Sequence, residues 1–147
     1  MSVRLDHLVV AAQTLEEGVA WCEATLGIAP GPGGRHPLMG THNRLFSIAS
    51  AAFPKAYLEI IAIDPAACAL GRARWFGLDT AALHATPRLL HFVVRTPDIR
   101  AACRRLAAMG EDVGTPGAAS RATPQGELHW QISVRDDGGL PHGGALP

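Results

Sequence analysis

A strand–helix pattern that occurs twice is the feature of this sequence that most constrains its fold. Residues 5–27 read LDHLVVAAQTLEEGVAWCEATLG, and residues 89–110 read LLHFVVRTPDIRAACRRLAAMG. In each copy a histidine, His7 or His91, is the third residue of an apolar run that favours a β-strand. The recurrence of such a unit after about half of the chain predicts an internal duplication, with two histidines at related positions.

The helix signals and a second matching segment extend this repeat. Thr14 and Asp98 each follow their histidine by seven residues and can cap the helix that comes next. His91 lies 84 residues after His7, and the same offset places RLFSIA at 44–49 onto LHWQIS at 128–133. The repeat therefore continues beyond the first helix.

The composition limits the kind of protein that this chain can be. It has 147 residues, of which 48% are hydrophobic and 18% charged, enough to build one domain around a sizeable core. The 13 basic and 13 acidic residues cancel, which argues against a nucleic-acid partner. No apolar run reaches membrane-spanning length, and the N-terminus lacks the apolar core of a signal peptide. With three cysteines and no Cys-x-x-Cys pair, a soluble cytoplasmic protein is expected.

The periodicity divides the single domain, residues 1–147, into a first module at about 1–65, a linker at about 66–87 and a second module at about 88–147. The linker is expected to wrap the outside with some helix. Residues 111–127 are expected to be loop with at most one short strand, because they are rich in Gly, Pro, Ala and Ser. Strands are predicted at 4–12, 44–49, 57–63, 89–95 and 128–134.

Three polar residues stand in the middle of apolar strands: His7, Glu59 and His91. A carboxylate buried without a partner costs several kcal/mol, so Glu59 should have one. Two imidazoles and one carboxylate are a ligand set for divalent ions such as zinc, iron, nickel, cobalt or manganese. The alternative is that the histidines bind Glu59 or backbone groups through hydrogen bonds, without a metal.

The order of these segments resembles the vicinal-oxygen-chelate superfamily, which includes glyoxalase I, bleomycin-resistance proteins, extradiol dioxygenases and methylmalonyl-CoA epimerase. LDHLVV and LLHFVV open the two halves and YLEII closes the first. HPLMGTHNRL, YLEIIAIDP and SRATPQGELHW are most similar to a glyoxalase-like domain group within it. The resemblance implies an α+β fold of tandem βαβββ modules, whose curved mixed sheet surrounds a cup. It also places His7, Glu59 and His91 at three of four metal positions; the fourth would lie on a last strand that is apparently missing.

The resemblance further implies a small-molecule enzyme, with a divalent metal that chelates vicinal oxygens in lyase, isomerase or dioxygenase chemistry. The alternative is a metal-free protein of the same fold that binds or sequesters a small molecule. Candidates for catalysis are His129 and Gln131, placed on the cup face by their polarity. Candidates for substrate binding are Asn43 and Arg44, with Arg121 as a further cation. The open sheet edge left by a missing strand predicts a homodimer.

Overall fold

The computed structural model describes residues 3–80 and 86–147, which form seven strands, two α-helices and short 3₁₀ turns. The first half of the chain has the order βαβββ and the second half βαββ. The elements are β1 (Arg4–Ala11), α1 (Leu15–Leu26), β2 (Arg35–His36), β3 (Thr41–Ser47), β4 (Tyr57–Ile63), η1 (Trp75–Gly77), β5 (Arg88–Arg95), α2 (Ile99–Ala108), β6 (Thr115–Thr123), β7 (Gly126–Val134) and η3 (Pro141–Gly144).

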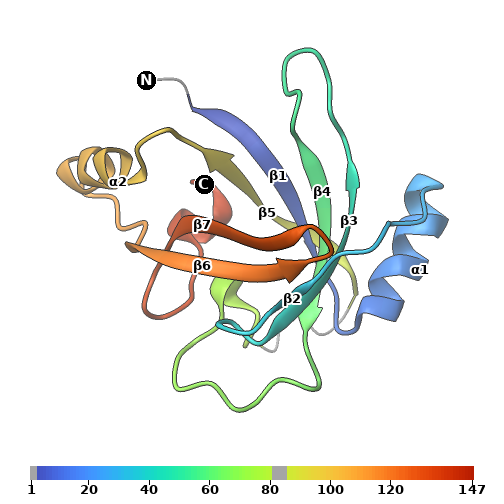
Figure 1. Ribbon diagram of the computed structural model, residues 1–147. Coiled ribbons are helices and arrows are strands. Elements are labelled where there is room, and N and C mark those ends of the chain that lie inside the picture. Colours follow the sequence, from blue (N-terminus) through green and yellow to red (C-terminus); the bar gives the residue numbers. More distant parts are fainter. Residues whose placement is uncertain (1–2, 81–85) are drawn as a thin grey trace.

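The strands form a five-stranded sheet and a separate hairpin. The order in the sheet is β2-β3-β4-β1-β5; β1 runs parallel to β4 and antiparallel to β5, so the sheet is mixed. β6 pairs only with β7 among the described residues. In Figure 1 this hairpin crosses in front of the larger sheet, while α1 and α2 lie at opposite sides of the molecule. The predicted α+β fold with a curved mixed sheet is confirmed, and the sheet does not close.

Helix α1 begins and ends where the sequence signals indicate. The Thr14 side chain accepts a hydrogen bond from the Glu17 backbone N–H at 3.1 Å and so satisfies one of the free donors of the first turn. Gly27 ends the helix in the left-handed conformation, with φ of 69°. The helix packs on one face of the sheet through Cys22, which belongs to a buried cluster with Val10 and Ile60. The two-residue alternation of β1 and β4 predicts that Leu8, Val10, Leu58 and Ile60 lie beneath the helices, and all four belong to this cluster or pack against it.

The opposite face of the sheet carries the other core cluster, in which buried Val9, Ala11 and Ile61 pack with residues of the linker. Trp75 and Leu78 are 5% and 3% exposed and belong to this cluster. The expectation that the linker only wraps the outside is therefore wrong for its described part. The indole of Trp75 fills the concave side of the sheet, where apolar surface would otherwise face water.

The second module differs most from expectation. β6 is a nine-residue strand in a segment predicted to be mostly loop, because it pairs along its whole length with β7. No residue of α2 is fully buried, and the helix contacts β6 and β7. The alternation of β5 predicts that Val94 lies beneath a helix together with Phe92, but Val94 lines a cavity on the concave side.

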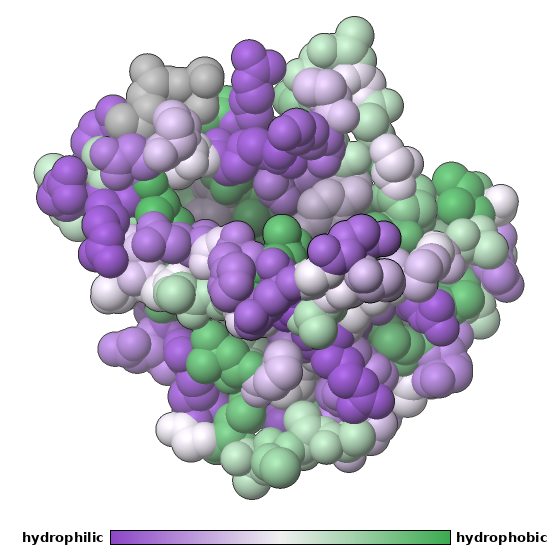
Figure 2. All heavy atoms as spheres, in the orientation of Figure 1, coloured by the Kyte–Doolittle hydropathy of each residue, from purple (hydrophilic) through white to green (hydrophobic). Residues whose placement is uncertain are grey.

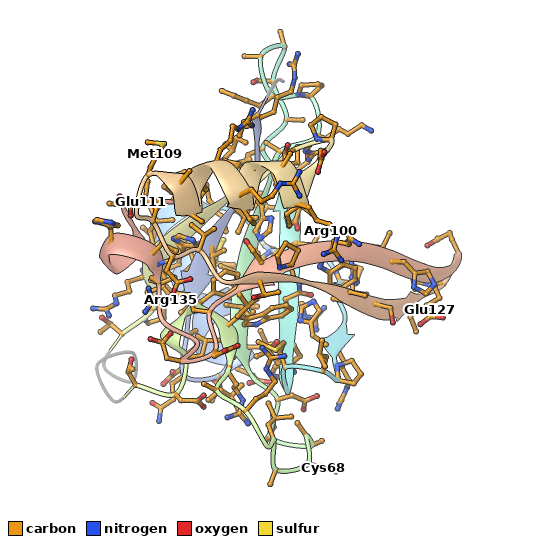
Figure 3. The ribbon with its side chains drawn as sticks, turned by 90° about the vertical axis from the view of Figure 1, so that its left-hand side faces the viewer. Cys68, Arg100, Met109, Glu111, Glu127 and Arg135 are labelled. Carbon is orange, nitrogen blue, oxygen red and sulfur yellow. The ribbon has the colours of Figure 1, made fainter. Side chains whose placement is uncertain are left out.

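No eighth strand is present among the described residues. After β7, residues 135–147 form a turn and the 3₁₀ turn η3. The hairpin projects beyond the rest of the molecule, with Glu127 near its tip (Figure 3). No described helix is long and apolar enough to cross a lipid bilayer.

Candidate functional site

A cavity of about 480 Å³ lies between the concave face of the sheet and the hairpin. Figure 2 shows that the face on which the hairpin lies is hollowed. The apolar part of the wall comes from the sheet, the linker and β7, and its main residues are Leu45, Trp75, Phe76, Val93, Trp130 and Ile132. Such a mixture of apolar walls with a few convergent polar groups is typical of small-molecule sites.

His7 and Glu59 lie side by side in this cavity. The parallel register of β1 and β4 pairs His7 with Tyr57 and Val9 with Glu59, so alternate residues of both strands face the concave side. His7 Nε2 lies 3.4 Å from Glu59 Oε2, and its Nδ1 lies 2.8 Å from Asp6 Oδ1. The two side chains are buried, with His7 8% and Glu59 5% exposed. The prediction that Glu59 needs a partner is confirmed.

The charges of this pair stabilise each other. Burial alone would lower the pKa of His7, but the hydrogen bonds to Asp6 and Glu59 outweigh burial and raise it to about 9. Burial alone would raise the pKa of Glu59, but the contacts with His7 and Asn43 lower it. Near neutral pH the site therefore holds a carboxylate beside an imidazolium.

Asn43 fixes the orientation of Glu59 from the neighbouring strand. Its Nδ2 donates a hydrogen bond of 2.5 Å to Glu59 Oε1, and its Oδ1 accepts one of 2.8 Å from the Gly34 backbone N–H. Asn43 is only 5% exposed. It lines the cavity, as expected of a substrate-binding candidate, but both ends of its amide are already bonded within the protein.

One aromatic ring, Tyr57, and a further ion pair complete the polar part of the cavity wall. Tyr57 stacks on His7 with ring centroids 4.5 Å apart and an interplanar angle of 16°. Burial raises the pKa of Tyr57, and the carboxylate of Glu59 raises it further, so its hydroxyl stays neutral. Asp6 is also paired with Arg95, at 2.9 Å.

His36 is a site residue that sequence reasoning missed, because it lies in a Gly- and Pro-rich segment that resembles an exposed loop. It is 6% exposed, lines the cavity, and its Nδ1 lies 3.1 Å from Thr41 Oγ1. Burial lowers the pKa of His36, which keeps its ring neutral at pH 7. No local signal in the sequence identifies it, because its burial depends on the pairing of β2 with β3, which places His36 opposite Thr41.

His91 does not join His7 and Glu59. It is buried at 6% exposure but lines two other hollows, and its ring centroid lies 5.8 Å from that of Phe76. Phe76, at a left-handed φ of 58°, lines both the main cavity and one of those hollows. The predicted triad of metal ligands is therefore not assembled: in the antiparallel pairing of β1 and β5, Val93 stands opposite His7, and His91 stands opposite Val9. The described ranges contain no group of three His, Cys, Asp or Glu side chains that could hold a metal ion.

The remaining candidates divide between the cavity and the surface. Gln131 and Arg121 line the cavity, whereas the side chain of His129 is 69% exposed, with its Nε2 3.5 Å from Glu127 Oε2. Arg44 is exposed on β3 and does not line the cavity. The expectation that His129 faces the cup is wrong, because β7 presents its apolar residues to the core.

Comparisons with known proteins agree with this architecture. A family model described as a glyoxalase-like domain matches residues 5–147. No curated protein matches the sequence. A hypothetical protein from Staphylococcus aureus is 22% identical with a TM-score of 0.62; the match covers 92% of this chain and 55% of that one, so this chain spans about half of its length.

Two solved enzymes have a similar fold. A methylmalonyl-CoA epimerase variant from Streptomyces coelicolor, in complex with 2-nitronate-propionyl-CoA, is 17% identical with a TM-score of 0.55 over 88% of this chain and 96% of that one. The methylmalonyl-CoA epimerase from Mycobacterium tuberculosis is 16% identical with a TM-score of 0.51 over 89% and 88%. At these identities the likeness establishes a shared fold.

Proposed function

The chain belongs to the glyoxalase-like domain family, and from that premise we propose that it is an enzyme that acts on a small molecule at His7 and Glu59. The observation that carries the proposal is the buried carboxylate of Glu59, with Oε2 3.4 Å from His7 Nε2, in the wall of a cavity of about 480 Å³. Ionisable groups with shifted pKa values in a concave site are typical of catalytic centres.

The pair is suited to proton transfer next to a carbonyl group. Glu59 Oε2 can accept a proton from a substrate carbon, while His7 Nε2–H can donate a hydrogen bond to the oxygen on which negative charge develops. Asn43 holds the carboxylate through Oε1 and leaves Oε2 directed at His7. The fold likeness to methylmalonyl-CoA epimerases supports isomerase or epimerase chemistry within the broader set of lyase and dioxygenase reactions predicted from the sequence.

We further propose that the enzyme uses a divalent metal ion. Two of the predicted ligands, His7 and Glu59, are placed suitably to bind one. Two ligands about 2.1 Å from one ion at a tetrahedral angle are separated by roughly 3.4 Å, which equals the distance between His7 Nε2 and Glu59 Oε2. His7 would have to release its Nε2 proton to bind such an ion; zinc, iron, nickel, cobalt or manganese would then supply a Lewis acid that polarises the substrate oxygens. His91 does not provide the third ligand in this arrangement.

A second candidate function is metal-free binding or sequestration of a small molecule. The apolar side chains of Trp75, Phe76, Trp130 and Ile132 in the cavity wall favour it. Under this function His7→Gln leaves the affinity for the ligand intact, whereas the enzyme proposal predicts that turnover is lost.

Hydrogen exchange at carbon tests the enzyme proposal even while the product of the reaction is unidentified. The protein is incubated in D₂O with small 2-oxo acids, hydroxyketones and acyl thioesters, without metal and with each of the five metals, and loss of the proton signal next to the carbonyl is followed by NMR. We expect exchange of at least one compound class, reduced about 100-fold or more in Glu59→Gln and unchanged in the surface control His129→Gln. No exchange of any compound under any metal condition would refute the proposal.

A further inference from the structure

We propose that Arg121 forms a subsite for one anionic oxygen group of the substrate, so that the small molecule bound at His7 and Glu59 is an anion with an apolar body. This inference rests on the proposed function for the place where the substrate binds, and it adds the chemical class of that substrate.

Arg121 reaches the cavity from β6, where it stands opposite Leu128 of β7. Its guanidinium lies against Gly34: a Cβ built on that glycine would be 2.6 Å from Arg121 Nη1. The absence of a side chain at position 34 therefore leaves the space that the guanidinium occupies. The side chain is half-buried in the wall and so is only partly solvated.

Arg121 has no carboxylate partner among the described residues, unlike the other charged groups of this wall. Asp6 is paired with Arg95 and with His7, and Glu59 is bonded to Asn43 and His7. Both carboxylates that line the cavity are thus already engaged. A partly desolvated cation without a counter-ion is costly, and an anionic ligand would remove that cost.

The positive charge of Arg121 affects the ionisation of a histidine in the cavity wall. Burial lowers the pKa of His36, and the positive charge of Arg121 lowers it further. An arginine presents a planar fork of donors that matches the two oxygens of a carboxylate. The wall next to it, formed by Leu128, Trp130 and Ile132 of β7, is apolar. The cavity therefore offers a cationic group beside a surface for an aliphatic or aromatic body.

A matched pair of fluorescent probes tests this subsite. 8-Anilinonaphthalene-1-sulfonate and N-phenyl-1-naphthylamine share the same apolar body and differ by the sulfonate anion. Dissociation constants of both probes are measured for the wild-type protein, Arg121→Gln, Arg121→Lys and the control Arg100→Gln. Arg100 is an exposed cation on α2, outside the cavity (Figure 3).

We expect Arg121→Gln to weaken binding of the sulfonate probe about tenfold, the effect of one charge-assisted contact, and to leave the neutral probe unchanged. Arg121→Lys should retain most of the affinity for the anion, and Arg100→Gln should match the wild type with both probes. The subsite is refuted if the wild type and Arg121→Gln bind the sulfonate probe equally well. It is also refuted if neither protein binds this probe. An equal loss of both probes in Arg121→Gln would refute it as well.

The subsite and the enzyme proposal fail separately. If Arg121→Gln weakens binding of the sulfonate probe alone, the subsite is supported even when no substrate exchanges its carbon-bound hydrogen. Conversely, exchange that depends on Glu59 but is indifferent to Arg121→Gln, with no anion preference, would keep the function and eliminate the subsite.

Discussion

Replacing Asn43 by leucine, which keeps the branched shape and the number of heavy atoms of the side chain but removes its polar atoms, should destabilise the protein strongly. The substitution removes the 2.5 Å hydrogen bond to Glu59 Oε1 and the 2.8 Å hydrogen bond from the Gly34 N–H. A hydrogen bond to a buried charged group contributes about 1.5–3 kcal/mol, and Glu59 is only 5% exposed. The bond to Gly34 adds about 1 kcal/mol, because water can reach its half-buried backbone.

The free energy of unfolding should therefore fall by about 3 kcal/mol, which urea denaturation at pH 7 measures as a lower midpoint at constant slope. Arg44→Leu is the matched control: it lies on the same strand, is exposed, and should change stability by less than about 0.5 kcal/mol. If Asn43→Leu loses no more than this control, then Asn43 does not hold Glu59 and the description of the site is wrong.

The other predictions concern pH, packing and assembly. Folding raises the pKa of His7 from 6.5 to about 9. The protonated ring therefore stabilises the fold fully below about pH 6.5, and this stabilisation is lost as the pH rises through about 9. The urea midpoint of the wild type should fall across this range, and that of His7→Gln should change less. Gly18→Ala should cost about 1–3 kcal/mol, because the added Cβ would be 2.3 Å from Ile60 Cγ2; thermal melts that match the wild type would contradict the packing of α1. The homodimer stays a prediction, which light scattering tests: a stable monomer at high concentration would show that the open edges of β6 and β7 need no second chain.

The parts of the fold that depend on local signals could be predicted from the sequence. The N-cap Thr14, the terminating Gly27 and the alternation in β4 act within a few residues, and the structure has them where expected. β6 could not be found in this way, because Gly117 and its small neighbours have low strand propensity. Its extended conformation comes from hydrogen bonds with β7, a non-local pairing.

The site was predictable only where strand periodicity governs it. His7 and Glu59 meet because the parallel pairing of β1 and β4 preserves the alternation read from each strand. Periodicity also predicts His91 beside them, but the antiparallel register of β1 and β5 places Val93 opposite His7, and the pattern within one strand does not specify the register between two. Polarity assigns His129 to the cup, whereas the core requires the apolar side of β7.

The ionisation of His7 tests directly whether His7 and Glu59 form one coupled pair in the cavity. Ring-nitrogen NMR of the ¹⁵N-histidine-labelled protein, with the signal assigned by His7→Gln, follows this group across the pH range. We expect the titration midpoint of His7 to be about 9 and to be lower in Glu59→Gln, because a neighbouring negative charge is removed. A wild-type midpoint near 6.5 that does not move in Glu59→Gln would show that His7 and Glu59 are not coupled.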